Sequence, residues 1–285
     1  YSTIGETGGN EQSRSFFYPK PRAVLTWTLD KDDQVRLRYE RVLGQLDFGN
    51  FIATSSLGGN GIQGGNPDLK PDQHTQYEIS YERHFWDRGA LVVTAMHDEI
   101  QDVVDNVPVT NSSGTFDAPG NIGAGTLDQL DIELTLPLDR FGLTNGLLKS
   151  TNIFRRSRVK DPVTGIERDI SPGLSGNQSV RPQDVEFTLT QDLPSLKSTW
   201  EIDYFNGWDE HYYRIEEVRH RRVLPPYISV AWIYKPTPTW SLRLELDNLG
   251  RFVYANTFFE SDGPRNLFPV TEIDERRITS QPRVY

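Results

Sequence analysis

The chain has 285 residues, with 40 acidic and 30 basic side chains, a formal net charge of −10 and no cysteine. The acidic balance argues against a nucleic-acid partner, because binding to a phosphate backbone depends on clustered lysine and arginine. The lack of cysteine excludes disulfides, thiolate metal sites and thiol nucleophiles. No run approaches the roughly 18 apolar residues of a transmembrane helix. Strands with a single apolar face, however, would not be evident from a mean hydropathy of −0.57.

The predicted elements are strands with one apolar and one polar face. In the second of them, Val35, Leu37 and Tyr39 alternate with Arg36 and Arg38, and later strands repeat this period of two. We predict about eleven strands, near residues 22–29, 34–44, 75–86, 90–103, 122–136, 147–159, 183–192, 197–206, 226–235, 240–256 and 276–285. The first residues contain no initiator methionine and no signal-peptide pattern, so we expect the chain to be a segment of a longer polypeptide.

The connections between these strands favour a barrel over a β-sandwich. Short turns are expected near residues 30–33, 86–89, 193–197 and 236–239, with a somewhat longer one at 137–146. Long polar stretches are expected near 46–73, 104–120, 160–181, 206–225 and 259–275. Outer-membrane barrels have short turns at one rim and long loops at the other, whereas a sandwich has no reason for this order. Most tryptophans, such as Trp27, Trp86 and Trp200, lie near short turns, as in the aromatic girdle of a membrane barrel.

The sequence therefore predicts an all-β fold, an antiparallel transmembrane β-barrel. Transporter barrels of about 22 strands carry a plug in the lumen, and about eleven strands are half of such a barrel. An open sheet of this size would leave two unpaired edges in lipid, which is costly because no water is present to bind the free backbone groups. We therefore expect other strands of the same polypeptide to complete the barrel.

Residues 65–71 (GNPDLKP) and the strand that follows them (QYEISYE, 76–82) resemble the TonB-dependent outer-membrane receptors. In that family an Asn-Pro-x-Leu-x-Pro segment, matched here by Asn66, Pro67, Leu69 and Pro71, closes a long loop before a barrel strand rich in Tyr and Glu. Similar segments are RYER at 38–41, DPVTGIER at 161–168 and LELDNLG at 244–250. The resemblance implies that residues 1–285 form the C-terminal half of the receptor barrel. The plug domain, its TonB box and the N-terminal barrel strands would then lie outside this chain.

The resemblance also implies a function in the outer membrane of a Gram-negative bacterium. Such receptors contact outer-membrane lipid, bind a scarce nutrient and import it into the periplasm when the TonB system pulls on the plug. Siderophore-bound iron, cobalamin and an oligosaccharide all remain open as the nutrient. The alternative functions are a soluble β-sandwich that binds carbohydrate and a passive porin.

The segment 206–222 (NGWDEHYYRIEEVRHRR) is the candidate ligand-binding site, because aromatic side chains beside charged ones suit the capture of a polar ligand. The residues expected to contact ligand are Trp208, His211, Tyr212, Tyr213, Arg219 and His220. In the alternative interpretation, residues 213–216 only extend a hairpin above the membrane, and the aromatic side chains pack on a neighbouring loop.

We expect no metal site, no cofactor and no catalytic activity. The runs His97-Asp-Glu99 and Asp209-Glu-His211 contain metal-ligand residue types, but adjacent strand residues point to opposite faces and cannot all meet at one ion. The sequence has no Gly-x-Ser-x-Gly, no His-Glu-x-x-His and no phosphate-binding glycine loop. Carboxylates on one face, such as Asp131 and Glu133, are typical of a solvated barrel wall.

Overall fold

The main sheet consists of antiparallel strands that follow one another in chain order. The computed structural model describes residues 17–45, 56–58, 61–63, 66, 68–111, 114–172 and 180–285. The path of the sheet is β1 (Arg22–Thr28), β2 (Asp33–Leu43), β5 (Gln73–Phe85), β6 (Gly89–Gln101), β9 (Gly125–Pro137), β10 (Gly146–Lys160), β12 (Gln183–Leu193), β13 (Ser198–Phe205), β16 (Tyr227–Thr237), β17 (Trp240–Asp247) and β20 (Arg283–Val284). The short strand β11 (Glu167–Arg168) pairs with the end of β10.

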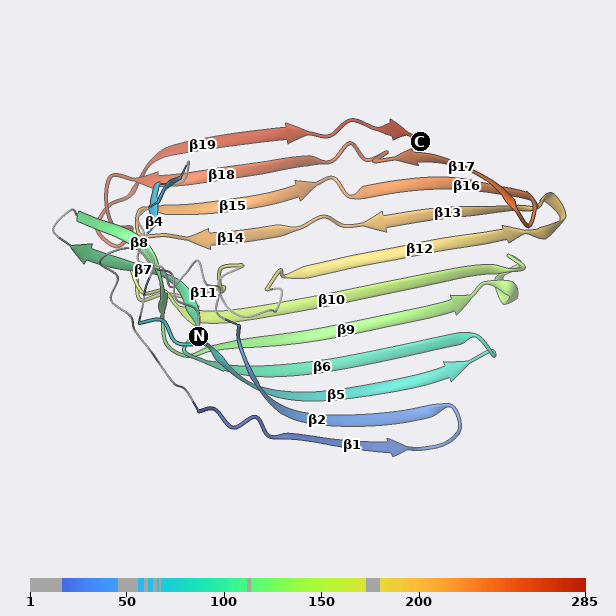
Figure 1. Cartoon of the computed structure of the whole chain (residues 1–285), viewed down its shortest axis with the longest axis horizontal. Coiled ribbons are helices and arrows are strands. Elements are labelled where there is room, and N and C mark those ends of the chain that lie inside the picture. Colours follow the sequence, from blue (N-terminus) through green and yellow to red (C-terminus); the bar gives the residue numbers. More distant parts are fainter. Residues whose placement is uncertain are drawn as a thin grey trace, which may run out of the picture.

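Two smaller sheets lie beyond one end of the main sheet. One contains β14 (Asp209–Tyr213), β15 (Glu217–Leu224), β18 (Val253–Ser261) and β19 (Val270–Thr279), and the other contains β3 (Ser56–Gly58), β4 (Gly61–Gln63), β8 (Gly114–Asn121) and β7 (Val104–Asn111). In Figure 1, β14, β15, β18 and β19 continue the lines of β13, β16, β17 and β20. Within the described residues the chain therefore makes eleven passes, which confirms the predicted strand number.

A row of backbone irregularities separates the main sheet from the sheet that contains β14. The four breaks fall at residues 206–208, 225–226, 248–252 and 280–282. Gly207 has a φ of +80°, and a Cβ at this position would lie 2.1 Å from the carbonyl oxygen of Val223. Residues 225 and 226 are prolines, which cannot donate to the strand ladder. The Asn248 side chain bridges the third break, because its Oδ1 accepts a hydrogen bond from the Phe252 amide at 3.0 Å.

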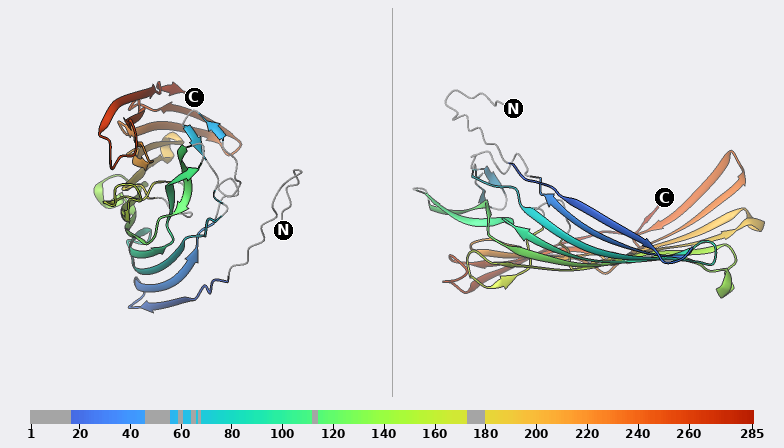
Figure 2. Two further views of the ribbon diagram at one scale, coloured as in Figure 1. Left: turned by 90° about the vertical axis from the view of Figure 1, so that its left-hand side faces the viewer. Right: turned by 90° about the horizontal axis from the view of Figure 1, so that it is seen from below.

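The sheet is a single curved layer. Figure 2 (left) shows that its strands form an open arc rather than two packed sheets, which does not fit a β-sandwich. The two ends of the strand path, β1 and β20, do not pair with each other. No helix within the described ranges is long and apolar enough to cross a membrane.

Short and long connections lie at opposite ends of the strands, as the sequence predicts. The turns after β1, β5, β9, β12 and β16 are short and lie on the right of Figure 1, whereas the small sheets lie on the left. The expected long stretch at 206–225 is instead the hairpin of β14 and β15, with a turn of only three residues, 214–216. Likewise, residues 104–120 form the hairpin of β7 and β8, and the stretch at 259–275 shortens to 262–269.

Candidate ligand-binding site

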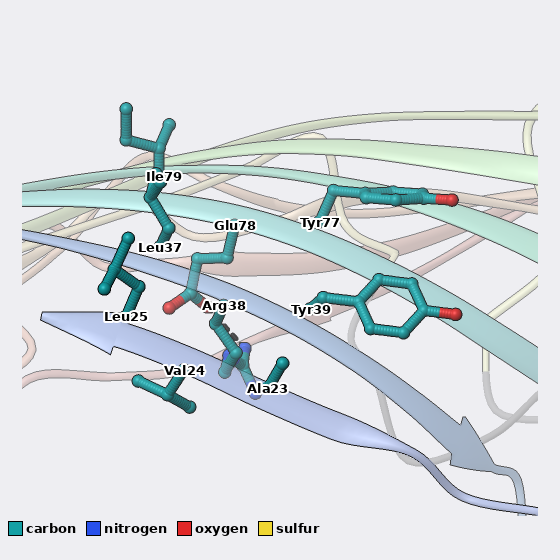
Figure 3. Close-up of a pocket in the computed structure, with 9 residues that line it drawn as sticks. All are labelled: Ala23, Val24, Leu25, Leu37, Arg38, Tyr39, Tyr77, Glu78 and Ile79. Carbon is teal, nitrogen blue, oxygen red and sulfur yellow. Dashed lines mark hydrogen bonds and ion pairs between the residues drawn. The ribbon is translucent and has the colours of Figure 1, made fainter.

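One face of the main sheet carries a continuous apolar row. The strand register joins Leu25, Leu37, Ile79, Ala95 and Leu130 in direct cross-strand pairs from β1 to β9. Leu37 and Ile79 are nevertheless 43% and 51% exposed. Leu25, Leu37 and Ile79, drawn in Figure 3, help to line a shallow groove of about 490 Å³. Contiguous exposed apolar side chains of this kind are typical of a sheet face that lies against lipid.

The opposite face of the main sheet carries charged side chains that pair across strands. Arg38 on β2 forms an ion pair with Glu78 on β5, which Figure 3 marks with dashed lines. Arg155 on β10 contacts Asp184 on β12 at 2.5 Å and Gln129 on β9 at 2.6 Å. Along each strand these charged side chains alternate with those of the apolar row, so they lie on the opposite face of the sheet. This arrangement suits the wall of a water-filled lumen.

Long connections fold over the charged face at the end of the sheet that bears the loops. A small buried core marks the place, and it consists of Ile100, Val103, Leu127, Val159 and Ile170. In this core, the strand residues Ile100, Leu127 and Val159 belong to the same face as the ion pairs, by the alternation of β6, β9 and β10. Val103 and Ile170 come from the connections themselves. The loops are therefore anchored on the lumen side by apolar contacts.

The predicted ligand residues lie on β14, on β15 and at the first strand break, and they divide between the two faces of the hairpin. The register pairs His211 with His220, so these two side chains share one face. Tyr213 follows His211 at a spacing of two and lies on the same face. Tyr212 pairs with Arg219 on the opposite face. The structure therefore does not bring the six residues together at a single place, and residues 213–216 extend a hairpin, as in the alternative interpretation.

On the first face, His211 is in contact with two other rings. Its imidazole stacks on that of His220, with ring centroids 4.3 Å apart and planes 9° from parallel, and it lies 6.2 Å from the ring of Tyr213. His220 Nε2 forms a 2.6 Å hydrogen bond with Asp209 Oδ1. Burial, and then the neighbouring His220, lower the pKa of His211 below its ordinary value. The His211 imidazole is therefore available as a neutral donor or acceptor at neutral pH.

On the second face, arginines lie over aromatic rings. The guanidinium of Arg219 is 4.5 Å from the ring centre of Tyr212, and that of Arg221 is 5.2 Å from it. The Tyr212 hydroxyl donates to Glu210 at 3.2 Å and accepts a hydrogen bond from Arg221. The Tyr212 hydroxyl is thus engaged within the protein, whereas the buried Nε atoms of Arg219 and Arg221 have no hydrogen-bond partner among the described residues. The cation–π contacts of this group stiffen the hairpin.

Trp208 lies at the first strand break and packs against β12 and β18. The Arg181 guanidinium, just before β12, is 4.8 Å from the ring of Trp208, and Tyr254 on β18 is 6.4 Å from it. Trp208 Nε1 is buried and has no hydrogen-bond partner in the part of the chain that the structure describes. A buried donor without a partner is uncommon, and among the predicted ligand residues both Trp208 Nε1 and Arg219 Nε are of this kind.

A buried ionic cluster close to Tyr213 was not anticipated from the sequence. Asp161 Oδ2 accepts hydrogen bonds from Arg168 Nε at 2.7 Å and from Arg265 Nη2 at 2.9 Å, and Arg168 Nη1 also donates to Asp105 at 2.8 Å. The Arg168 guanidinium stacks over the ring of Tyr213 at 4.3 Å. We call Asp105, Asp161, Arg168 and Arg265 the loop cluster. Its only sequence signal is the DPVTGIER segment, which begins with Asp161 and ends with Arg168.

The electrostatics of the loop cluster follow from burial and pairing. The side chains of Asp105, Asp161 and Arg168 are 0%, 2% and 6% exposed. Burial alone would raise the pKa of the Asp161 carboxyl. Hydrogen bonds from Arg265, from the Thr164 amide and from Arg168 outweigh this effect and hold that pKa well below its usual range. Asp161 is therefore a stable anion on which the connections after β10 and β18 meet.

The loop cluster and its neighbours hold the turn of the β14–β15 hairpin. Asn106 on β7 donates from Nδ2 to the Tyr213 carbonyl at 3.2 Å, and the Ile215 amide donates to Asp117 on β8 at 2.9 Å. Arg265 Nε donates to the Arg214 carbonyl at 2.5 Å. The β7–β8 hairpin and the connections after β10 and β18 therefore converge on one turn, and this convergence defines the candidate site.

Comparison with known proteins agrees with this architecture. Residues 1–249 match the family model described as TonB dependent receptor-like, beta-barrel. The chain therefore belongs to the TonB-dependent receptor family and carries strands of its β-barrel domain, which confirms the resemblance of the GNPDLKP segment. Proteins of this family lie in the outer membrane of Gram-negative bacteria. No curated protein sequence matches the chain.

A solved structure with a similar fold is a mutant of the ferric enterobactin receptor from Pseudomonas aeruginosa, in complex with enterobactin. The TM-score is 0.58 at 15% sequence identity, and the match covers 90% of this chain and 39% of that one. At this identity the likeness concerns the fold alone. The chain spans less than half the length of the receptor that it matches.

Proposed function

We propose that this chain supplies the loop-bearing wall of a TonB-dependent receptor that binds a scarce nutrient and imports it into the periplasm. The observation that carries the proposal is the convergence of the β7–β8 hairpin and the connections after β10 and β18 on the turn end of the β14–β15 hairpin, above a sheet with one apolar and one charged face. Loops held by a rigid scaffold are where binding residues concentrate. Family members are receptors and transporters rather than enzymes, which fits a role without catalysis.

The nutrient that fits best is a ferric siderophore, with cobalamin and an oligosaccharide as the other candidates. The similar receptor was solved in complex with enterobactin, and arginine beside tyrosine suits an anionic, aromatic ligand. Of the residues proposed to contact it, His211, Tyr213 and His220 share one face of the hairpin. Trp208, Tyr212 and Arg219 complete the proposed set. The TonB system would act through the plug of the full-length protein.

Uptake by the full-length receptor in its native outer membrane tests this proposal. Trp208→Ala combined with His211→Ala should weaken siderophore-dependent iron uptake and leave barrel assembly intact, as judged by heat-dependent gel mobility. Glu245→Gln on the charged face of β17 is the matched control. Unchanged uptake in the double variant would mean that the β14–β15 hairpin has only a structural role.

A second experiment separates the receptor from the passive porin. Uptake through the proposed receptor should disappear in cells that lack TonB, whereas diffusion through a porin should continue. The intact mass of the native polypeptide adds to this test, because a plugged receptor must be well over twice the 32.6 kDa of this chain. Uptake that is independent of TonB would support the porin.

A further inference from the structure

Three side chains with metal-ligand atoms meet on one face of the β14–β15 hairpin. Asp209 and His211 are two residues apart on β14, so they point to the same side, and His220 is the direct cross-strand partner of His211. One ligand atom from each of the three residues lies within 4.8 Å of the others. The sequence argument excluded a site made of three consecutive residues, and Glu210 does point to the opposite face. His220 on β15 takes the third position instead.

The spacing of these atoms is close to that of a coordination sphere. Two ligands of a tetrahedral zinc ion with bonds of about 2.0–2.1 Å lie roughly 3.4 Å apart. The His220 Nε2 to Asp209 Oδ1 distance is already 2.6 Å. The two imidazoles are stacked, so one ring must turn about its Cβ–Cγ bond before both can direct a nitrogen at one ion. Such a rotation changes no backbone hydrogen bond.

We propose that Asp209, His211 and His220 bind one divalent transition-metal ion of the zinc class. Two imidazoles and one carboxylate suit zinc, nickel or copper, whereas calcium and magnesium require mainly oxygen ligands. The three ligands leave at least one coordination position for water or for a donor atom of another molecule. This site goes beyond the proposed nutrient uptake, because it requires neither the plug nor the TonB system.

The other three histidines, His74, His84 and His97, lack such an arrangement among the described residues. His97 forms a 2.7 Å pair with Asp128, and His84 forms a 2.7 Å pair with Glu82, in each case without a second imidazole. Both ring nitrogens of His74 face carboxylates, Asp98 at 2.7 Å and Asp72 at 3.2 Å. His97 is therefore a matched control, since it is an exposed histidine with a bonded aspartate on the same protein.

A bound ion would link the two strands of the hairpin by side chains. Asp209 and His211 lie on β14 and His220 lies on β15, so coordination adds a cross-link next to the turn on which the loops converge. An ion that binds only the folded protein stabilises it in proportion to its occupancy. Zinc should therefore raise the melting temperature of the extracellular hairpins.

Titration of the purified full-length receptor with Zn²⁺ alone, in detergent and without any nutrient, tests the proposal. The wild-type protein should bind one more equivalent of Zn²⁺ than the variant with both His211→Ala and His220→Ala, and Ca²⁺ should not compete. His97→Ala should bind as the wild type does. Asp209→Asn, at a position that is half exposed, should weaken the affinity because it removes the anionic ligand.

Folding of each variant is checked by heat-dependent gel mobility, and His211→Gln with His220→Gln replaces the alanine pair if that pair does not fold. Equal Zn²⁺ stoichiometry and affinity in the wild type and the folded histidine variant would overturn the proposal. An equal loss of binding in His97→Ala would overturn it as well. Because no nutrient is present, this result is independent of whether the hairpin contributes to uptake.

Discussion

Leu244 on β17 offers a direct test of the lipid-facing assignment. Its side chain is 48% exposed and pairs with Trp232 on the apolar face, while Glu245 lies on the charged face and binds Arg243 at 2.8 Å. Leu244→Arg would place a charge in hydrocarbon, whereas Glu245→Gln changes a group that lies in a wet lumen. We expect Leu244→Arg to destabilise the barrel and Glu245→Gln to have little effect on its assembly.

The magnitude follows from the position of Leu244 along β17. The strand starts at Trp240, next to a short turn where the aromatic girdle is expected. A tilted strand rises roughly 2.6 Å per residue along the membrane normal, so Leu244 lies about 10 Å above the girdle. The apolar band of such barrels is about 25 Å tall, which puts Leu244 near its middle. The cost of an arginine there is about 2–4 kcal/mol.

Leu242 serves as the depth control, since it lies on the same face only about 5 Å above the girdle. Unfolding of the full-length barrel in lipid vesicles by guanidinium, followed by tryptophan fluorescence, should give a smaller loss for Leu242→Arg than for Leu244→Arg. Heat-dependent gel mobility reports whether each variant assembles. Equal tolerance at Leu244 and Glu245, or an equal cost at both leucines, would refute the lipid-facing assignment.

Two further predictions concern the loop cluster. Asp161→Ala leaves Arg168 and Arg265 buried without their shared carboxylate, which should cost about 3–5 kcal/mol of local stability and speed proteolysis of the loops, while Glu272→Gln on exposed β19 should not. Wild-type rates after the Asp161 change would contradict this role. Because the pKa of Asp161 is depressed on folding, its contribution is present above the ordinary value of 3.8 and is lost only in stronger acid. Protease resistance of the loops should therefore persist at pH 4–5, which is about one unit or less above that value. Loss of resistance already above about pH 5 would count against the ion pairing.

Much of the main sheet can be predicted from sequence because one of its faces is apolar and the other is polar. The predicted strands at 34–44 and 75–86 correspond closely to β2 and β5. The predicted strands did not include β14 and β15, although the alternative interpretation placed a hairpin at residues 213–216. All five residues of β14 are polar or aromatic (DEHYY), so no alternation marks it as a strand. Beyond the apolar band both faces of a sheet can be polar. The alternation of apolar and polar residues that predicts strands is then absent.

The candidate site was only partly predictable. Composition led to the 206–222 segment, but the division of its residues between two faces depends on the register that the short turn imposes. The loop cluster was less accessible still. Asp161 and Arg265 are 104 positions apart, and only the three-dimensional arrangement of the connections joins them. A carboxylate in a polar connection is usually exposed to solvent, so no sequence pattern indicates that Asp161 is buried.

The row of strand breaks has a mechanical consequence. At residues 206–208, 225–226 and 248–252, the regular backbone ladder stops and prolines, glycines or side-chain hydrogen bonds replace it. Only a few backbone hydrogen bonds remain at this row, such as that from the Val223 amide to the Trp208 carbonyl, so we expect distortion of the outer hairpins to be taken up there more than in the ladder below it. The two levels then form separate units of local unfolding, with faster amide exchange above the row than below it. The hairpins can adapt to a bound molecule while the wall of the barrel stays rigid.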